Sequence, residues 1–306
     1  MLLRPGVTCG TAIKFLEELT TGSLNNLSNR LPRFEELDQL PHGIVPIVLE
    51  YERWVQQTAR EVSAVFADHT IVARLRGGRY GTIQATSNPA QVLFLLRAEL
   101  SELRDYLGYE FANELRELQQ RFIHHKGRTL VLDSNDVLHY QRFDTIPWVK
   151  LYGAGCVVVF PHVIVDEIDK KGYDTGSDKV RTRARGVYRL LEQLQITMDA
   201  TGGRATLKDG TAVEIIADEI EHVRLGNNDN EAIACASMLQ QALAPGQVTV
   251  ITRDIGMRAR ARTRKLKAEA LPDKYLIPGG GFSGVELDKA LAEITPPPEG
   301  SAAPQS

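Results

Sequence analysis

The stretch that decides the fold is RTLVLDS, residues 128–134, in which an apolar, β-branched run leads into Asp133. Such a run is typical of a strand that is buried on both faces of a parallel sheet. GCVVVFP (155–161) and GQVTVITRD (246–254) repeat the pattern. Apolar residues recur at helical spacing between and after these runs, at about 161–171, 177–195, 230–243 and 255–268. Because strands alternate with helices, the sequence predicts a three-layer α/β domain with a central parallel sheet and right-handed crossovers.

The part of the chain before this domain has a different pattern. Residues 44–66 and 90–122 repeat apolar side chains at spacings of three and four, which indicates helices. TIVARLRGGRYGTIQAT (70–86) is predicted to be a hairpin that turns at Gly77-Gly78, and RATLKDGTAVEIIA (204–217) a second one that turns at Asp209-Gly210. The predicted organisation is a mostly helical region with a hairpin, an α/β domain and a disordered tail rich in Pro, Ala and Ser, over 1–126, 127–294 and 295–306.

Composition narrows the class of protein. The chain has 306 residues, of which 43% are hydrophobic and 25% charged, the balance of a soluble globular protein. The net charge of −3 gives no overall attraction to nucleic acid or to an anionic membrane, so polyanion binding requires local clusters. The cysteines Cys9, Cys156 and Cys235 are far apart, which argues against a disulfide framework and fits a reducing compartment. Without a membrane-length apolar run or a signal-peptide pattern, we expect a cytoplasmic protein that does not enter a membrane.

Acidic residues follow the predicted strands. Asp133 ends the first strand, Glu167 lies on the helix after the second, and Asp254 ends the third. Asp229 and Glu231 open the helix that precedes the third strand. Each could simply cap a helix or form a turn. Ligands of open parallel sheets bind beyond the carboxyl ends of the strands, however, and clustered carboxylates repel one another unless a cation neutralises them. The pattern therefore favours a site for a hard cation such as Mg²⁺ or Mn²⁺.

Four segments, taken in order, resemble the motifs of PIN domains. They are TLVLDSNDVLH (129–139), VVVFPHVIVDEIDKK (157–171), NDNEAIACA (228–236) and VTVITRDIGMRARA (248–261). The segment from 177 to 194 is similar to the basic helix that often follows the second motif. The resemblance covers roughly 129–277 and no part of the N-terminal half.

The resemblance implies a function and a set of residues. It implies a PIN-like endoribonuclease that uses one or two Mg²⁺ or Mn²⁺ ions to hydrolyse RNA phosphodiester bonds. The catalytic acidic residues would be Asp133, Glu167, Asp229 and Asp254, and the same four, with Glu231, would be the metal ligands. The orienting residues would be Ser134, Asn135 and Thr252.

The third motif departs from the family pattern. Many members have Asp where this chain has Asn230, and Asp229 and Glu231 flank that position. We take both as candidates, Asp229 first. The departure keeps a second hypothesis open, that of a catalytically inactive PIN-like module for RNA binding or assembly.

Basic residues between the second and third motifs agree with a polyanionic partner, for which we expect single-stranded RNA. Phosphate contacts need only such a patch, although a solvated helix face has the same composition. The predicted RNA-binding residues are Lys170, Lys171, Lys179, Arg181, Arg183 and Arg185. A second basic run covers 258–267, and Arg74, Arg76, Arg79 and Tyr80 on the predicted hairpin offer a further surface.

Other interpretations fit less well. A haloacid dehalogenase-type phosphatase requires a second Asp two residues after the first, where this chain has Asn135. A toxin of a toxin–antitoxin pair is usually little more than the PIN domain itself. His124 and His125 invite a metal interpretation, but neighbouring histidines are expected to face apart. The sequence leaves open whether the protein forms a homo-oligomer.

Overall fold

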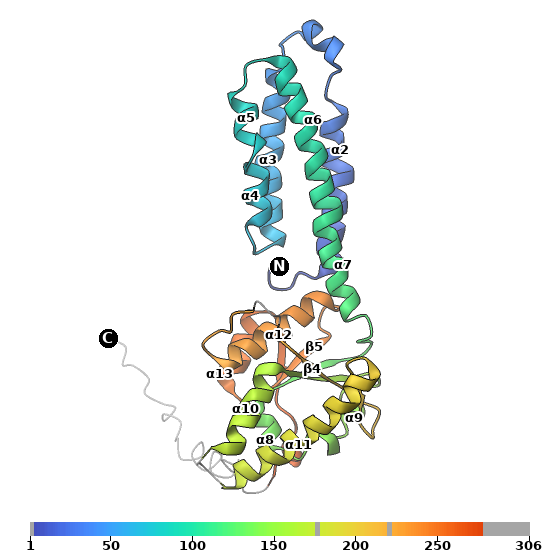
Figure 1. The fold of residues 1–306 in the computed structure, drawn as a ribbon, viewed down its shortest axis with the longest axis vertical. Coiled ribbons are helices and arrows are strands. Elements are labelled where there is room, and N and C mark those ends of the chain that lie inside the picture. The colour runs from blue at the N-terminus through green and yellow to red at the C-terminus, as the bar shows by residue number, and fades with distance from the viewer. Residues whose placement is uncertain (1–2, 175–177, 219–221, 278–306) are drawn as a thin grey trace, which may run out of the picture.

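The computed structural model describes residues 3–174, 178–218 and 222–277. The predicted tail over 295–306 and the predicted domain end at 294 lie outside these residues. Two hydrophobic cores are present, one formed by residues between Leu3 and Leu115 and one by residues between Phe122 and Leu271. Figure 1 shows an elongated helical bundle standing on an α/β body. Within the described residues, no helix combines the length and the apolar character needed to cross a membrane.

The α/β body is built on a six-stranded sheet with the order β3-β4-β2-β1-β5-β6. All neighbouring strands run parallel except β3 and β4, which confirms the predicted α/β class with a central, mostly parallel sheet. The three central strands are buried along their whole length, as their uninterrupted apolar runs predict. The strands are β1 (Thr129–Leu132), β2 (Val157–Pro161), β3 (Ala205–Thr206), β4 (Ala212–Ile216), β5 (Val248–Ile251) and β6 (Lys267–Glu269).

Helices connect the strands and pack around the sheet (Figure 1). α10 packs against both α11 and α12, and α12 packs in turn against α13. The helices of the body are α8 (Ser134–His139), η4 (Phe143–Thr145), α9 (Trp148–Tyr152), α10 (His162–Tyr173), α11 (Asp178–Thr201), α12 (Asn228–Ala242), α13 (Ile255–Thr263) and η5 (Asp273–Tyr275).

The N-terminal region is a bundle whose last three helical segments follow one another without interruption from Pro89 to Arg121. The apolar side chains predicted to repeat at spacings of three and four in this run are mostly leucines, and they are buried through Leu115 because they recur on one face of the helix. The segments of the bundle are α1 (Cys9–Glu18), η1 (Leu19–Leu24), α2 (Asn25–Asn29), η2 (Phe34–Gln39), α3 (Val45–Val65), α4 (Thr70–Arg76), α5 (Arg79–Ala85), α6 (Pro89–Asp105), η3 (Tyr106–Phe111) and α7 (Ala112–Arg121).

The prediction of a hairpin over 70–86 was wrong, because the segment forms the helices α4 and α5. Its β-branched residues suggested strands, but Ile71 and Leu75 lie one helical turn apart and are both buried in the bundle. Arg74 contacts the buried carboxylate of Glu99 at 3.1 Å. Arg74 and Arg79, which both pair with Glu99, therefore support the bundle, and the further surface expected on a hairpin is not formed.

The second predicted hairpin is confirmed, since β3 and β4 pair antiparallel and Gly210 adopts a φ of 89° between them. β4 also pairs parallel with β2, which the sequence did not predict. The predicted helix over 255–268 is too long. α13 ends at Thr263, and the chain reverses at Lys265, with a φ of 57°, to enter β6.

Candidate functional site

The first acidic residue lies where two central strands end together. Leu132 of β1 pairs with Ile251 of β5, so Asp133 and Thr252 follow their strands side by side. Thr252 Oγ1 donates a hydrogen bond of 2.9 Å to Asp133 Oδ2, and the backbone N–H of Asn135 donates to Asp133 Oδ1 at 3.4 Å. Asp133 is only 2% exposed. The strand pairing thus fixes one buried carboxylate at the carboxyl end of the sheet.

The surroundings of Asp133, including other carboxylates, shift its pKa. Burial raises its pKa, hydrogen bonds from Thr252 and Asn135 act in the opposite direction, and the negative charges of Asp229 and Glu167 raise it further. The net pKa lies above the ordinary value of an aspartate. The structure therefore brings Asp229 and Glu167 within electrostatic range of Asp133.

Glu167 lies on α10, in contact with a cation. Lys171 Nζ lies 2.8 Å from Glu167 Oε1, 3.2 Å from Ser134 Oγ and 3.0 Å from Asn135 Oδ1. Burial favours the neutral form of Glu167, but the hydrogen bond and charge of Lys171 outweigh it and hold the pKa of Glu167 below its usual value. The side chains of Ser134 and Asn135 thus face Lys171. Asn135 contacts the Asp133 carboxylate only through its backbone N–H.

The remaining two acidic residues lie at helix N-termini. Asp229, in the first turn of α12, pairs with Arg260 of α13. Asp254 caps α13, because its Oδ1 accepts a hydrogen bond of 2.9 Å from the N–H of Met257. The N–H of Asp254 also donates to Thr252 Oγ1 at 3.1 Å, which ties this cap to the residue that holds Asp133. We call Asp133, Glu167, Asp229 and Asp254 together the acidic edge.

The acidic edge is looser than a closed metal site. Among the described residues, no three of its side chains bring ligand atoms within 4.8 Å of one another. Lys171 and Arg260 instead hold Glu167 and Asp229. The carboxylates fit small divalent cations through their oxygen donors and through the mutual repulsion that adds to the effect of burial in raising the pKa of Asp133. For a metal ion to bind, Lys171 and Arg260 would have to move away from Glu167 and Asp229.

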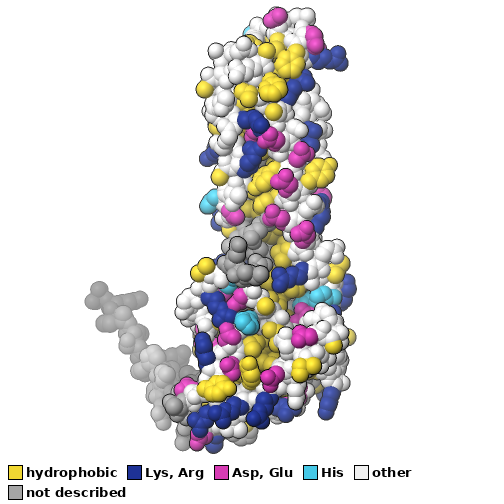
Figure 2. All heavy atoms as spheres, in the orientation of Figure 1, with side chains coloured by type: hydrophobic (Ala, Val, Ile, Leu, Met, Phe, Trp, Pro, Cys, Tyr) yellow, Lys and Arg dark blue, Asp and Glu magenta, His cyan; other side chains and the backbone are white. Residues whose placement is uncertain are grey.

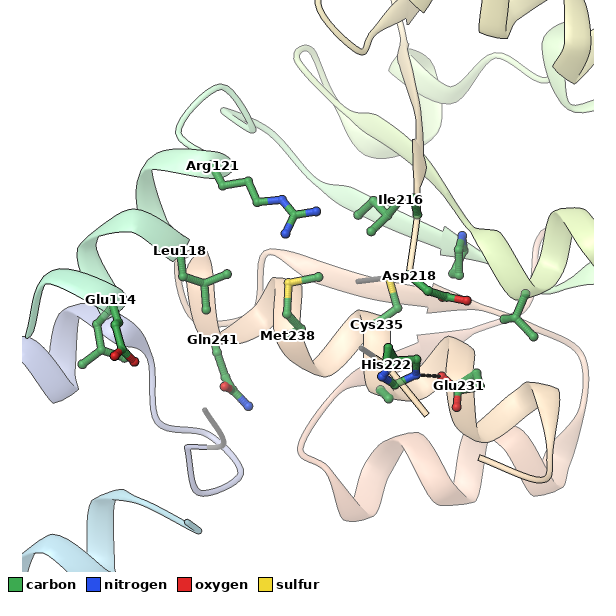
Figure 3. A pocket seen from close by; sticks show the side chains of 15 residues that line it. Glu114, Leu118, Arg121, Ile216, Asp218, His222, Glu231, Cys235, Met238 and Gln241 are labelled. Carbon is green, nitrogen blue, oxygen red and sulfur yellow. Dashed lines mark hydrogen bonds and ion pairs between the residues drawn. The ribbon is translucent and has the colours of Figure 1, made fainter. Parts of the chain in front are cut away.

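Glu231 lies outside the acidic edge. It is buried, its Oε2 lies 2.9 Å from His222 Nε2, and its Oε1 accepts a hydrogen bond from the N–H of Leu225. Figure 3 shows Glu231 paired with His222 at a cavity of about 360 Å³ that lies between α7 and the α/β body. Of the two acidic candidates in the third motif, Asp229 is therefore the one that joins the acidic edge.

The predicted RNA-binding residues lie on α10 and α11, where Lys and Arg side chains gather at the lower end of Figure 2. Several of them already have partners within the protein. Arg183 and Arg185 donate to the carbonyls of Leu138 and Gly172, and Arg181 pairs with Asp178. Lys170 and Lys179 are exposed, while Lys171 points into the acidic edge.

A further acidic residue near Asp133, not predicted from the sequence, is Asp136, which is 3% exposed. Burial raises its pKa to about 7. Its Oδ1 accepts a hydrogen bond of 3.0 Å from the N–H of Arg253, and its Oδ2 has no partner among the described residues. The signal that could have found it is its position in the first turn of the helix that follows Asp133, where a side chain turns back toward the sheet.

The expectation that His124 and His125 face apart was also wrong. Both rings contact the carboxylate of Glu214, at 2.7 Å and 2.9 Å. The two histidines lie in the irregular segment between α7 and β1, where strand alternation does not apply.

Comparison with known proteins identifies the α/β body. No curated protein matches the chain. Residues 130–272 match the sequence model of the family described as the PIN domain, and this range contains every residue of the acidic edge. The C-terminal half of this chain therefore belongs to the PIN-domain family.

Proposed function

We propose that this protein is a Mg²⁺- or Mn²⁺-dependent endoribonuclease that hydrolyses phosphodiester bonds of single-stranded RNA at the acidic edge. PIN domains are generally nucleases. The observation that carries the proposal is the buried Asp133, which lies at the end of β1 within electrostatic range of Glu167 and Asp229. Carboxylates in this arrangement favour a bound divalent cation, because a cation removes their mutual repulsion.

Each residue has a role in the proposal. Asp133, Asp229 and Asp254 hold one or two ions, and Glu167 completes the site. When bound, such ions activate water and stabilise the charge that develops at phosphorus during in-line displacement. Thr252 keeps Asp133 in place through its hydroxyl. Lys171, released from Glu167, is close enough to neutralise a phosphate at the same edge.

The exposed lysines Lys170 and Lys179 support binding of the RNA backbone, since phosphate contacts require charge rather than sequence-specific geometry. The three free thiols, Cys9, Cys156 and Cys235, agree with a reducing compartment, and we place the protein in the cytoplasm.

The test is a cleavage assay with a mixed ladder of single-stranded RNAs, run with Mn²⁺, with Mg²⁺ and with EDTA. Wild type should cleave internally with either ion and not with EDTA. Asp133→Asn keeps the size of the side chain but removes the charge, so cleavage should fall to background. Asp199→Asn is the matched control, because Asp199 is exposed near the end of α11 and contacts Gln195.

The outcomes separate two functions. Equal cleavage by wild type and Asp133→Asn would show that any activity comes from elsewhere. The second candidate, an inactive PIN-like module for RNA binding or assembly, is favoured by the pairing of Asp229 with Arg260, since this ion pair already neutralises the charge of a proposed metal ligand. RNA retention without cleavage, in any divalent ion, would establish that function and contradict the nuclease.

A further inference from the structure

A second group of metal-ligating side chains lies apart from the acidic edge. His124 Nε2 is 2.7 Å from Glu214 Oε1, and His125 Nε2 is 2.9 Å from Glu214 Oε2. Among the residues that the structure describes, these three side chains form a group whose ligand atoms all lie within 4.8 Å of one another. We call them the His-His-Glu cluster.

The surroundings of the cluster resemble those of metal ligands in proteins. His125 is fully buried as a side chain, and its Nδ1 lies 2.9 Å from Thr129 Oγ1, which fixes the orientation of the ring. A ligating histidine is usually held in this way through its second nitrogen. Glu214 is held by Arg204, whose Nε lies 2.8 Å from Oε1, so one oxygen keeps this partner while the other can bind an ion.

The cluster is also accessible. The side chains of His124 and Arg204 are 33% and 34% exposed, so an ion can enter from solvent and a water molecule can complete its coordination. The cluster lies away from Asp133, because His125 contacts the first residue of β1 and Asp133 follows the last. The length of that strand separates them by roughly 13 Å.

We propose that the His-His-Glu cluster is a second metal site, specific for a transition metal ion such as Zn²⁺. Two imidazole nitrogens and one carboxylate oxygen suit Zn²⁺, whereas Mg²⁺ prefers oxygen ligands alone. His124 and His125 belong to the segment that joins the helical bundle to the PIN domain, and Glu214 lies in the middle of β4. The ion therefore cross-links this connection to the sheet. This proposal is independent of RNA cleavage.

The test measures binding of Co²⁺ and Zn²⁺ to the full chain in the presence of millimolar Mg²⁺, which occupies oxygen-only sites. Co²⁺ is followed by the visible absorption that nitrogen ligands produce, and Zn²⁺ by calorimetry and by the melting temperature. The variants are His124→Ala, at a partly exposed position that should tolerate the change, and Glu214→Gln, which keeps the shape of the side chain. His42→Ala is the control, at an exposed histidine of the bundle.

Wild type and His42→Ala should each bind one Zn²⁺ and melt at a higher temperature in its presence. In His124→Ala and Glu214→Gln, the affinity should fall by about a hundredfold or more, because loss of a ligand exceeds the effect of losing a supporting contact. Wild type that binds no Zn²⁺, or that binds it no better than His124→Ala, would overturn the proposal. Either result would mean that the cluster is only a set of hydrogen bonds between β4 and the segment that joins the helical bundle to the PIN domain.

Discussion

Thr252 and Asp133 follow neighbouring parallel strands and are joined by a hydrogen bond of 2.9 Å between the Thr252 hydroxyl and Asp133 Oδ2. The same hydroxyl accepts a hydrogen bond from the N–H of Asp254. One buried side chain thus links the first and last acidic residues of the acidic edge. The pairing of β1 with β5 sets Asp133 beside Thr252, and the short connection from β5 to α13 carries Asp254.

The first prediction concerns that hydroxyl. In Thr252→Val, Asp133 Oδ2 loses its partner in a buried position, so the free energy of unfolding should fall by about 1–3 kcal/mol. RNA cleavage should fall about 10- to 100-fold, as is typical when a ligand loses its supporting contact. Thr249→Val on β5 is the control, because Thr249 Oγ1 is buried and has no hydrogen-bond partner among the described residues. If both variants retained equal activity, Thr252 would not be a positioning residue.

The second prediction concerns metal linkage. Millimolar Mn²⁺ should raise the melting temperature of wild type, because a ligand that binds only the folded state stabilises it, by about 2.7 kcal/mol at a hundred times its dissociation constant. Asp133→Asn should melt higher than wild type in EDTA, since it removes one of the repelling charges, and should respond less to Mn²⁺. Differential scanning fluorimetry with and without Mn²⁺ measures both effects. A melting temperature of wild type that Mn²⁺ leaves unchanged would contradict a metal site at the acidic edge.

The third prediction concerns Lys171, whose ammonium group contacts Glu167. Because it competes with a metal ion for this carboxylate, Lys171→Met should raise the affinity for Mn²⁺ by roughly threefold to tenfold. RNA binding by the same variant should weaken, as a phosphate-neutralising charge is lost. Lys170→Met removes the neighbouring exposed lysine and is the control for metal affinity. Equal Mn²⁺ titrations of both variants would show that Lys171 does not compete.

The fourth prediction concerns pH. Burial raises the pKa of Asp136 from 3.8 to about 7, so between these values the folded protein holds a proton that the unfolded chain has lost. The free energy of unfolding should therefore decrease as pH rises through this window, by up to about 1.4 kcal/mol per pH unit.

Asp136→Asn should flatten that slope when urea unfolding is measured in EDTA from pH 4.5 to pH 7.5, as the neutral amide does not titrate. Asp144→Asn is the control, because the pKa of Asp144 is shifted in the opposite direction to that of Asp136. The hydrogen bond from Arg142 lowers the pKa of Asp144 from 3.8. The stability that the ionised Asp144 contributes is therefore lost only at pH values below 3.8. An unchanged slope in Asp136→Asn would assign the titration to another group.

The sequence predicted the central strands because β1, β2 and β5 are buried on both faces and are therefore uninterrupted apolar runs. It did not predict β6, a polar edge strand over Lys267–Glu269. The hairpin expected over 70–86 failed because burial in the bundle outweighed the β propensity of Thr70, Ile71 and Val72.

For the candidate site, the strand ends predicted where Asp133 and Asp254 would lie, since Asp133 directly follows β1 and Asp254 comes three residues after the end of β5. The sequence did not predict that Lys171 would lie between Glu167, Ser134 and Asn135, because that depends on the angle at which α10 packs. Nor did it pair Glu214 with His124 and His125, from which it is separated by about ninety residues. Contacts of this kind are determined by tertiary packing and leave no local pattern.

The uninterrupted helical run from Pro89 to Arg121 sets a distance within the molecule. At 1.5 Å per residue it is on the order of 50 Å long, and it ends just before the PIN domain begins. The far end of the bundle, near the exposed ring of Phe94, is therefore separated from the α/β body by the length of this run. The bundle is thus a spacer between its far end and the domain that carries the acidic edge.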